Sequence, residues 1–201
     1  MFDRRLSLLI ARPLQAMARR LHALGVGANS VTLAGCALGL GAATAIALQA
    51  FALAIALMLL SRLCDGVDGA LARITQPTDA GGFLDITLDF VFYASIPLAF
   101  ALADPARNGL AAAALLAAFV GTGTSFLAFA VIAAKRQLAS TDYPNKSFYF
   151  LGGLTEAGET LGFFIAMCVW PQHFAPLAWV FAALCVLTSV MRIGWGWRRF
   201  H

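Results

Sequence analysis

Long apolar stretches, separated by short polar segments, dominate the pattern of this chain. Six of them approach the length of about 20 residues that an α-helix needs to cross roughly 30 Å of hydrocarbon. They cover residues 29–50, 51–72, 84–103, 109–134, 155–170 and 174–195, and the fifth is the shortest. We therefore predict an all-α membrane protein with six transmembrane helices.

The first 25 residues follow a different pattern. Their apolar side chains recur at helical spacing with arginines between them, at Leu6, Leu9, Ile10, Leu14, Met17 and Leu21. This arrangement is typical of an amphipathic helix in the membrane interface, with its apolar face toward acyl chains and its arginines toward lipid phosphates. We expect residues 1–25 to form this interfacial helix and residues 26–201 to form a six-helix bundle, together a single domain spanning 1–201.

Composition and charge narrow the class of protein. Hydrophobic residues make up 61% of the chain and charged residues 12%, and the mean hydropathy is +0.81, which a soluble domain with a polar surface could hardly accommodate. Lysine and arginine outnumber aspartate and glutamate by 14 to 10, and most basic residues precede the first span or follow an even-numbered one. The positive-inside rule therefore places both termini and the even-numbered loops in the cytoplasm. The basic balance suits anionic lipid headgroups, and nothing in the sequence supports a nucleic-acid partner.

Two further features indicate packing rather than chemistry. The cysteines occur singly inside apolar stretches, without the close pairs of metal or redox sites, at Cys36, Cys64, Cys168 and Cys185. Gly35 and Gly39 form a small-xxx-small pair, which indicates close helix contact either within one subunit or between two.

Four aspartates lie where charged side chains are costly, near the facing ends of the second and third spans. Asp65 and Asp68 are three residues apart, so they share one face of their helix. Asp85 and Asp89, four residues apart, share a face of the next one. Because only residues 74–82 join these antiparallel neighbours, both pairs can meet at one level just inside the cytoplasmic surface.

Converging carboxylates would repel one another, and hard divalent cations such as Mg²⁺ or Mn²⁺, which prefer oxygen ligands, would remove that repulsion. Carboxylate clusters around two metal ions recur in phosphoryl-transfer enzymes. The alternative is that the aspartates form buried salt bridges with Arg62 and Arg73. Two arginines cannot neutralise four carboxylates, so we favour a metal site.

The residues around this cluster resemble the signature of the CDP-alcohol phosphatidyltransferase family, which reads D-x-x-D-G-x-x-A-R, a short loop, and then G-x-x-x-D-x-x-x-D. The matching positions are Asp65, Asp68, Gly69, Ala72, Arg73, Gly81, Asp85 and Asp89. The loop holds seven residues here, one fewer than is usual in the family. The resemblance implies six spans behind an amphipathic helix, frequent homodimers, and a multi-pass protein of the bacterial inner membrane with a cytoplasmic active site.

The resemblance also implies an activity. Family members transfer a phosphoalcohol group from a CDP-alcohol to a hydroxyl in phospholipid biosynthesis and release CMP, and the implied donor here is CDP-diacylglycerol. Two Mg²⁺ or Mn²⁺ ions held by the four aspartates are implied, with Asp89 also accepting the proton of the acceptor hydroxyl. Donor contacts are implied for Asn29, Thr32, Gly69, Ala72, Arg73, Thr78 and Gly81. Asn29 could instead cap the first span.

A polar segment from residue 135 to residue 160 lies where family members bind the acceptor. Its basic side chains, Lys135, Arg136 and Lys146, could bind an acceptor phosphate or rest on anionic lipid. Glu156 and Glu159 share a helix face and could recognise an amine or balance Arg192 in the last span. The sequence therefore does not select one acceptor.

Two non-enzymatic interpretations compete with this one. A divalent-cation carrier could use the same aspartates, but it would need polar groups or broken helices along a path to the other face, and the periplasmic halves of these spans are almost wholly apolar. A catalytically silent scaffold of the same fold usually lacks a motif aspartate, and all four are present. We therefore predict an enzyme.

Overall fold

The computed structural model describes residues 2–137 and 157–201, and the surroundings of side chains from residue 11 onward. Within these ranges every regular element is helical, which confirms the all-α prediction. The helices are α1 (Phe2–Ala23), α2 (Ala28–Ala47), α3 (Phe51–Thr75), α4 (Asp79–Ala103), α5 (Pro105–Lys135), α6 (Ala157–Val169) and α7 (Phe174–Phe200), with a 3-10 turn η1 (Pro171–His173) before α7.

Four segments of the described chain are long and apolar enough to cross a membrane: α2, α4, α5 and the stretch Pro171–Phe200 that contains α7. These are the elements of a multi-pass membrane protein. Helix α3 has 25 residues, but its second half carries Arg62, Asp65 and Asp68, and α6 has only 13 residues. Six crossings, which require α3 and α6 to span as well, stay a prediction.

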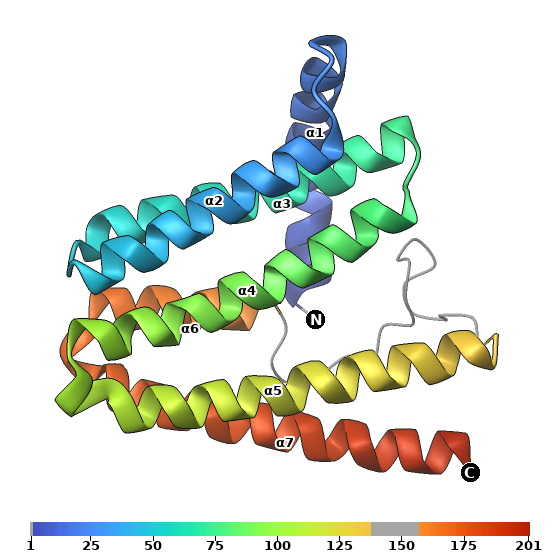
Figure 1. Ribbon diagram of the computed structural model, residues 1–201. Helices are drawn as coiled ribbons and strands as arrows, with labels where there is room; N and C mark the ends of the chain where they lie inside the picture. Colours follow the sequence, from blue (N-terminus) through green and yellow to red (C-terminus); the bar gives the residue numbers. More distant parts are fainter. Residues whose placement is uncertain (1, 138–156) are drawn as a thin grey trace.

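The helices form two packed groups that meet along α4 (Figure 1). Helix α2 packs against α3 and α4, while α5 packs against α4 and runs along α7. Helix α6 contacts α3 and α7, and α1 crosses the α2 and α3 pair at a steep angle. Because α3 and α4 follow one another and both pack near α2, their polar faces are held toward the same space.

The main apolar core lies in the half of the bundle away from the α3 to α4 connection. Its largest fully buried side chains include five aromatic rings: Phe92, Phe100, Phe164, Phe174 and Phe181. The rings of Phe100 and Phe174 stack with centroids 4.3 Å apart, and Phe92 meets Phe164 edge-on at 6.2 Å. Helix association in lipid depends on close packing, so these interlocking rings hold the two groups together.

Two glycines allow α2 to approach its neighbours closely. A Cβ atom on Gly35 would lie 3.0 Å from the Cβ of Cys64 on α3, and one on Gly39 would lie 2.6 Å from the ring of Phe92 on α4. The small-xxx-small pair therefore serves packing within the chain, one of the two possibilities that the sequence left open. The four cysteines are free, as expected of packing residues.

Helix α1 uses part of its apolar face against the bundle. Leu14 lies against α3 at Gly66, where a Cβ would come 3.0 Å from a Leu14 methyl carbon. Ala18 is fully buried in a small cluster with Val67 and Leu71 of α3. Placement of α1 in the membrane interface stays a prediction.

The connection between α3 and α4 is shorter than the sequence pattern indicated. Helix α3 continues to Thr75 and α4 already begins at Asp79, so three residues join them rather than the segment 74–82. Helix α4 begins early because the Thr78 side chain caps it, accepting a hydrogen bond from the backbone N–H of Gly81 at 3.1 Å. The tight corner holds the ends of the two helices together.

Candidate active site

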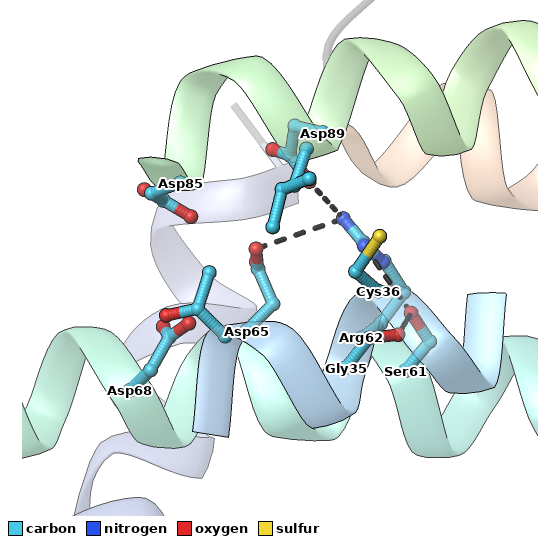
Figure 2. A pocket seen from close by; sticks show the side chains of 10 residues that line it. Gly35, Cys36, Ser61, Arg62, Asp65, Asp68, Asp85 and Asp89 are labelled. Atoms are coloured by element: carbon cyan, nitrogen blue, oxygen red, sulfur yellow. Dashed lines mark hydrogen bonds and ion pairs between the residues drawn. The ribbon is translucent and has the colours of Figure 1, made fainter. Parts of the chain in front are cut away.

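Three of the four signature aspartates converge at the α3 to α4 corner. One carboxylate oxygen each of Asp65, Asp85 and Asp89 lies within 4.8 Å of the others, and all three residues are partly buried. Figure 2 shows Asp65 rising from α3 while Asp85 and Asp89 point down from α4 into the same pocket. The three-residue corner brings the two helix faces level, as the helical spacing of the aspartates predicted.

Asp68 lies in the same pocket but more deeply. It is 5% exposed, and its Oδ2 atom has no hydrogen-bond partner among the described residues. A buried carboxylate oxygen without a partner is costly, and its place beside the other aspartates makes this one a candidate ligand for a cation.

The donor set suits a hard divalent cation. Clustered carboxylate oxygens are the ligands that Mg²⁺ and Mn²⁺ prefer, and the orphaned oxygen of Asp68 offers a further one. The residues present therefore fit the metal that the sequence predicted.

The salt-bridge alternative is correct in part, because Arg62 takes part in the cluster. Its Nη1 atom donates a hydrogen bond to Oδ1 of Asp89 at 2.7 Å and lies 3.7 Å from Oδ1 of Asp65. Arg73 is exposed and lies farther along α3, with its Nη1 atom 3.5 Å from the point that a Cβ on Gly69 would occupy. One arginine beside four carboxylates leaves a net negative site.

The carboxylates open into a cavity of about 1230 Å³. All seven positions that the resemblance assigned to the donor line it: Asn29, Thr32, Gly69, Ala72, Arg73, Thr78 and Gly81. A Cβ on Gly81 would lie 3.1 Å from both the Asn29 Oδ1 atom and the Thr78 Oγ1 atom, so the starts of α2 and α4 meet at this glycine. The alternative that Asn29 caps α2 is wrong, because the cap position is Gly27 and no side chain makes the capping bond.

The residues predicted for the acceptor are distributed unevenly. Arg192 lines the cavity from α7, where it is buried, donates to the Thr122 carbonyl at 2.8 Å and lies over the Phe126 ring. Arg136 instead donates to the Phe200 carbonyl at 2.6 Å, next to Lys135 at the end of α5.

Glu159 lies exposed in the first turn of α6, beside Thr160, which lines the cavity. Lys146 and Glu156 lie outside the described residues.

An apolar wall completes the cavity and was not predicted. It is formed between α4 and α5 by residues that include Ile86, Phe90, Leu116, Val120 and Leu127. The sequence offers no signal for it, because apolar residues on these helices are expected whether they face lipid, core or cavity. The cavity is thus polar at the carboxylates and apolar along α4 and α5.

Comparison with known proteins decides the family. A model of the family described as CDP-alcohol phosphatidyltransferase matches residues 26–191. The chain belongs to this family. Membership in the CDP-alcohol phosphatidyltransferases supports transfer of a phosphatidyl group in phospholipid synthesis.

Two curated relatives of this family member are informative. The chain is 49% identical over 197 residues to the inner membrane protein YnjF of Escherichia coli, covering 98% of this chain and 96% of that one. It is 32% identical over 99 residues to the archaetidylinositol phosphate synthase of Pyrococcus horikoshii, covering 49% of this chain and 53% of that one.

Solved structures share the fold. The phosphatidylinositol phosphate synthase of Mycobacterium tuberculosis with CDP-DAG bound superposes with a TM-score of 0.69 at 21% identity, over 92% of this chain and 94% of that one. The same enzyme in complex with manganese and citrate gives a TM-score of 0.73 at 21% identity, over 92% and 88% of the two chains. At this identity the likeness establishes the fold of this CDP-alcohol phosphatidyltransferase, and substrates have to be argued from the site.

Proposed function

We propose that the protein transfers a phosphatidyl group from CDP-diacylglycerol to an acceptor hydroxyl and releases CMP. The observation that carries the proposal is the aspartate cluster that lines a cavity with an apolar wall. CDP-diacylglycerol has the matching two parts, because its diphosphate would lie at the carboxylates and its acyl chains along the apolar wall. The likeness to a fold solved with CDP-DAG bound supports this choice of donor.

Asp65, Asp68, Asp85 and Asp89 would together hold Mg²⁺ or Mn²⁺, with two ions proposed. When bound, the metal supplies positive charge that offsets the negative charge developing on the donor diphosphate as CMP departs. The likeness to a fold solved with manganese supports a divalent cation.

The chain's own residues bind and orient the substrates. Arg73 clamps a phosphate oxygen at the cavity rim through a charge-assisted hydrogen bond. Gly69 and Ala72 leave room for the nucleotide against α3, and Asn29, Thr32, Thr78 and Gly81 contact it from the α2 and α4 side of the cavity.

Asp89 accepts the proton of the acceptor hydroxyl. One of its oxygens already accepts from Arg62, so the other is the one available for that proton. Catalysis therefore depends mainly on positioning and on charge neutralisation.

The acceptor is proposed to approach from the side of α5, α6 and α7. Arg192 is the cavity-lining member of the predicted acceptor set, which also includes Lys135, Arg136, Lys146, Glu156 and Glu159. A buried guanidinium at the cavity wall favours an acceptor with an anionic group.

The protein is proposed to reside in a bacterial inner membrane, as its E. coli relative does by name, with both termini and the active site cytoplasmic and as a homodimer. The basic residues that precede the first span and follow the even-numbered ones support this orientation.

The test is release of CMP from CDP-diacylglycerol by the purified protein in detergent with Mg²⁺ or Mn²⁺. Glycerol phosphate, inositol phosphate, serine, ethanolamine and phosphatidylglycerol are offered in turn, and Asp89→Asn serves as the inactive control. Metal-dependent release with one acceptor establishes reaction and substrate together. Near-normal turnover by Asp89→Asn would contradict the role of Asp89 as proton acceptor.

A second assay, with the protein reconstituted into sealed vesicles, separates the enzyme from its two alternatives. A divalent-cation carrier would move Mn²⁺ into sealed vesicles and release no CMP, and a silent scaffold would do neither. The aromatic core in the opposite half of the bundle favours the enzyme, because bulky apolar side chains such as Phe92, Phe100 and Phe174 are buried there, where a carrier would need polar groups.

A further inference from the structure

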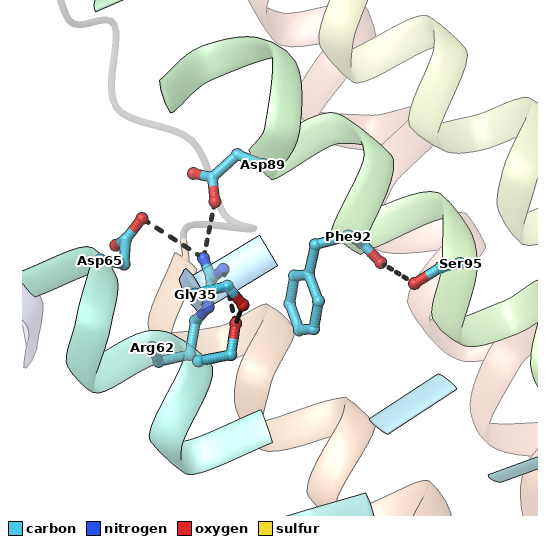
Figure 3. Close-up of polar contacts among 7 residues, drawn as sticks. Gly35, Arg62, Asp65, Asp89, Phe92 and Ser95 are labelled. Atoms are coloured by element: carbon cyan, nitrogen blue, oxygen red, sulfur yellow. Dashed lines mark hydrogen bonds and ion pairs between the residues drawn. The ribbon is translucent and has the colours of Figure 1, made fainter. Parts of the chain in front are cut away.

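Arg62 is a cation built into the carboxylate cluster, although the family signature starts three residues later. Figure 3 shows its guanidinium facing the carboxylates of both Asp65 and Asp89. The shared atom is Nη1, which is 2.7 Å from Oδ1 of Asp89 and 3.7 Å from Oδ1 of Asp65. Because Asp65 belongs to α3 and Asp89 to α4, a single guanidinium ties together carboxylates of two helices.

The opposite side of the guanidinium is anchored in the protein. Its Nη2 atom donates to the Ser61 hydroxyl at 3.3 Å, and that hydroxyl, which is fully buried, donates to the Gly35 carbonyl of α2 at 2.7 Å. The centre of the guanidinium lies 4.3 Å from the centroid of the Phe92 ring, in cation–π contact. The Arg62 side chain is only 16% exposed. Groups of α2, α3 and α4 therefore hold the guanidinium on the side opposite the aspartates.

This placement has two opposing electrostatic effects. Without a metal, clustered carboxylates repel one another, and a neighbouring positive charge offsets part of that repulsion. With a metal, the same positive charge repels the incoming divalent cation. A fixed cation in this position therefore stabilises the empty site and weakens metal binding.

We propose that Arg62 is a positioning residue and internal counter-ion of the metal site, holding Asp65 and Asp89 in place when no divalent cation is bound. Because it donates a hydrogen bond to Oδ1 of Asp89, it also leaves the other oxygen of that carboxylate to accept the proton of the acceptor hydroxyl. The part of this inference that concerns metal binding, its metal half, rests on the proposed function. The counter-ion role without bound metal rests only on the contacts of Arg62.

The first experiment measures Mn²⁺ binding directly, by the electron paramagnetic resonance signal of free Mn²⁺ in titrations of the purified protein. Arg62→Gln removes the charge, and Arg62→Lys keeps it without the forked geometry. We expect the half-saturating Mn²⁺ concentration to fall about tenfold in Arg62→Gln and to stay within about threefold of wild type in Arg62→Lys. Turnover should fall in both variants, because neither holds the two carboxylates through one rigid group.

The second experiment is a double-mutant cycle of thermal unfolding in EDTA, with Arg62→Gln, Asp89→Asn and the combined variant. We expect Arg62→Gln to lower the unfolding temperature and the added Asp89→Asn to restore part of the loss. Additive effects would overturn the counter-ion role. Should Arg62→Gln not fold, Arg62→Met is the second charge-removing variant, because an unbranched apolar chain suits the space beside Phe92.

The outcomes distinguish this inference from the proposed function. If wild-type protein binds Mn²⁺ and Arg62→Gln binds it with equal or weaker affinity, the proposed effect of Arg62 on metal binding is overturned while the metal site stands. If wild-type protein binds no Mn²⁺, the proposed metal site fails, and the metal half of this inference fails with it. The cycle in EDTA then still decides the counter-ion half.

Discussion

The two ends of the bundle treat their polar residues differently. At the end where α4 is followed by α5, polar side chains form hydrogen bonds with nearby backbone groups. Asp104 accepts from the Arg107 N–H at 3.1 Å, and the Asn108 side chain donates to the Phe100 carbonyl at 3.0 Å. Where α3 gives way to α4, the aspartates face each other and a cavity.

The first end closes over the aromatic core, and the second stays open. The hydrogen bonds at the closed end therefore contribute to stability. The clustered carboxylates at the open end repel one another, and this cost in stability is one that a bound ligand can offset.

Replacing one aspartate at each end tests the difference between the two ends most strongly. Asp65→Asn should lower CMP release about a thousandfold, because it removes a charged ligand from the cluster. Asp104→Asn changes the same atoms at the closed end, where asparagine caps a helix equally well, so its turnover should match wild type. Both are measured with the donor and acceptor that support turnover. Equal losses in the two variants would mean that the open end has no special chemistry.

Removing a ring from each end tests stability in the same way. Phe164 is fully buried in the core, and Phe164→Ala should lower the free energy of unfolding by about 3 kcal/mol, because it leaves a cavity among packed rings. Phe83, on α4 near the corner, is 72% exposed, and Phe83→Ala should change that free energy by less than about 0.5 kcal/mol. Denaturant unfolding in detergent measures both. A larger loss of unfolding free energy for Phe83→Ala than for Phe164→Ala would show that Phe164 does not lie in the core.

The open end was predictable in its essentials because the information is local. Helical spacing puts Asp65 beside Asp68 and Asp85 beside Asp89, and a short connection brings the two faces together. The error lay in the connection itself, where the cap by Thr78 starts α4 five residues before the predicted span at residue 84. Hydropathy alone could not locate that start, because the first turn of α4 is polar and glycine-rich.

Other features depend on contacts between distant residues. The pairing of Arg62 with Asp89 spans 27 residues, and its selection over Arg73 follows from which side chain reaches α4. The apolar wall between α4 and α5 depends on how those helices diverge, which no periodicity encodes. The segment with Lys146 and Glu156 lies outside the described residues, so the predictions made there stay predictions.

The contact between α2 and the core offers a sharper test of how tightly the two ends are joined. A Cβ on Gly39 would lie 2.6 Å from the buried Phe92 ring, whereas one on Gly41 would lie 3.6 Å from a Leu57 methyl carbon. Gly39→Ala should therefore lower the free energy of unfolding by about 1–3 kcal/mol, because the packed ring has little room to move. Gly41→Ala should be neutral or stabilising, since alanine is the better helix former. A Gly39→Ala variant as stable as Gly41→Ala would contradict the close contact between α2 and α4.

The smallest expected effect concerns the corner itself. Thr78→Ala removes the hydrogen bond that caps α4, which should lower the free energy of unfolding by about 1 kcal/mol, while Thr78→Ser keeps the hydroxyl and should stay close to wild type. Unfolding is measured in EDTA without donor, so that any lost nucleotide contact does not contribute. Because the cap fixes where α4 begins, we also expect Thr78→Ala to weaken Mn²⁺ binding slightly, through less rigid placement of Asp85. If Thr78→Ala raises the KM for donor and leaves unfolding unchanged, the hydroxyl serves the nucleotide rather than the helix, and the aspartates are aligned by the packing of α2 and α4 alone.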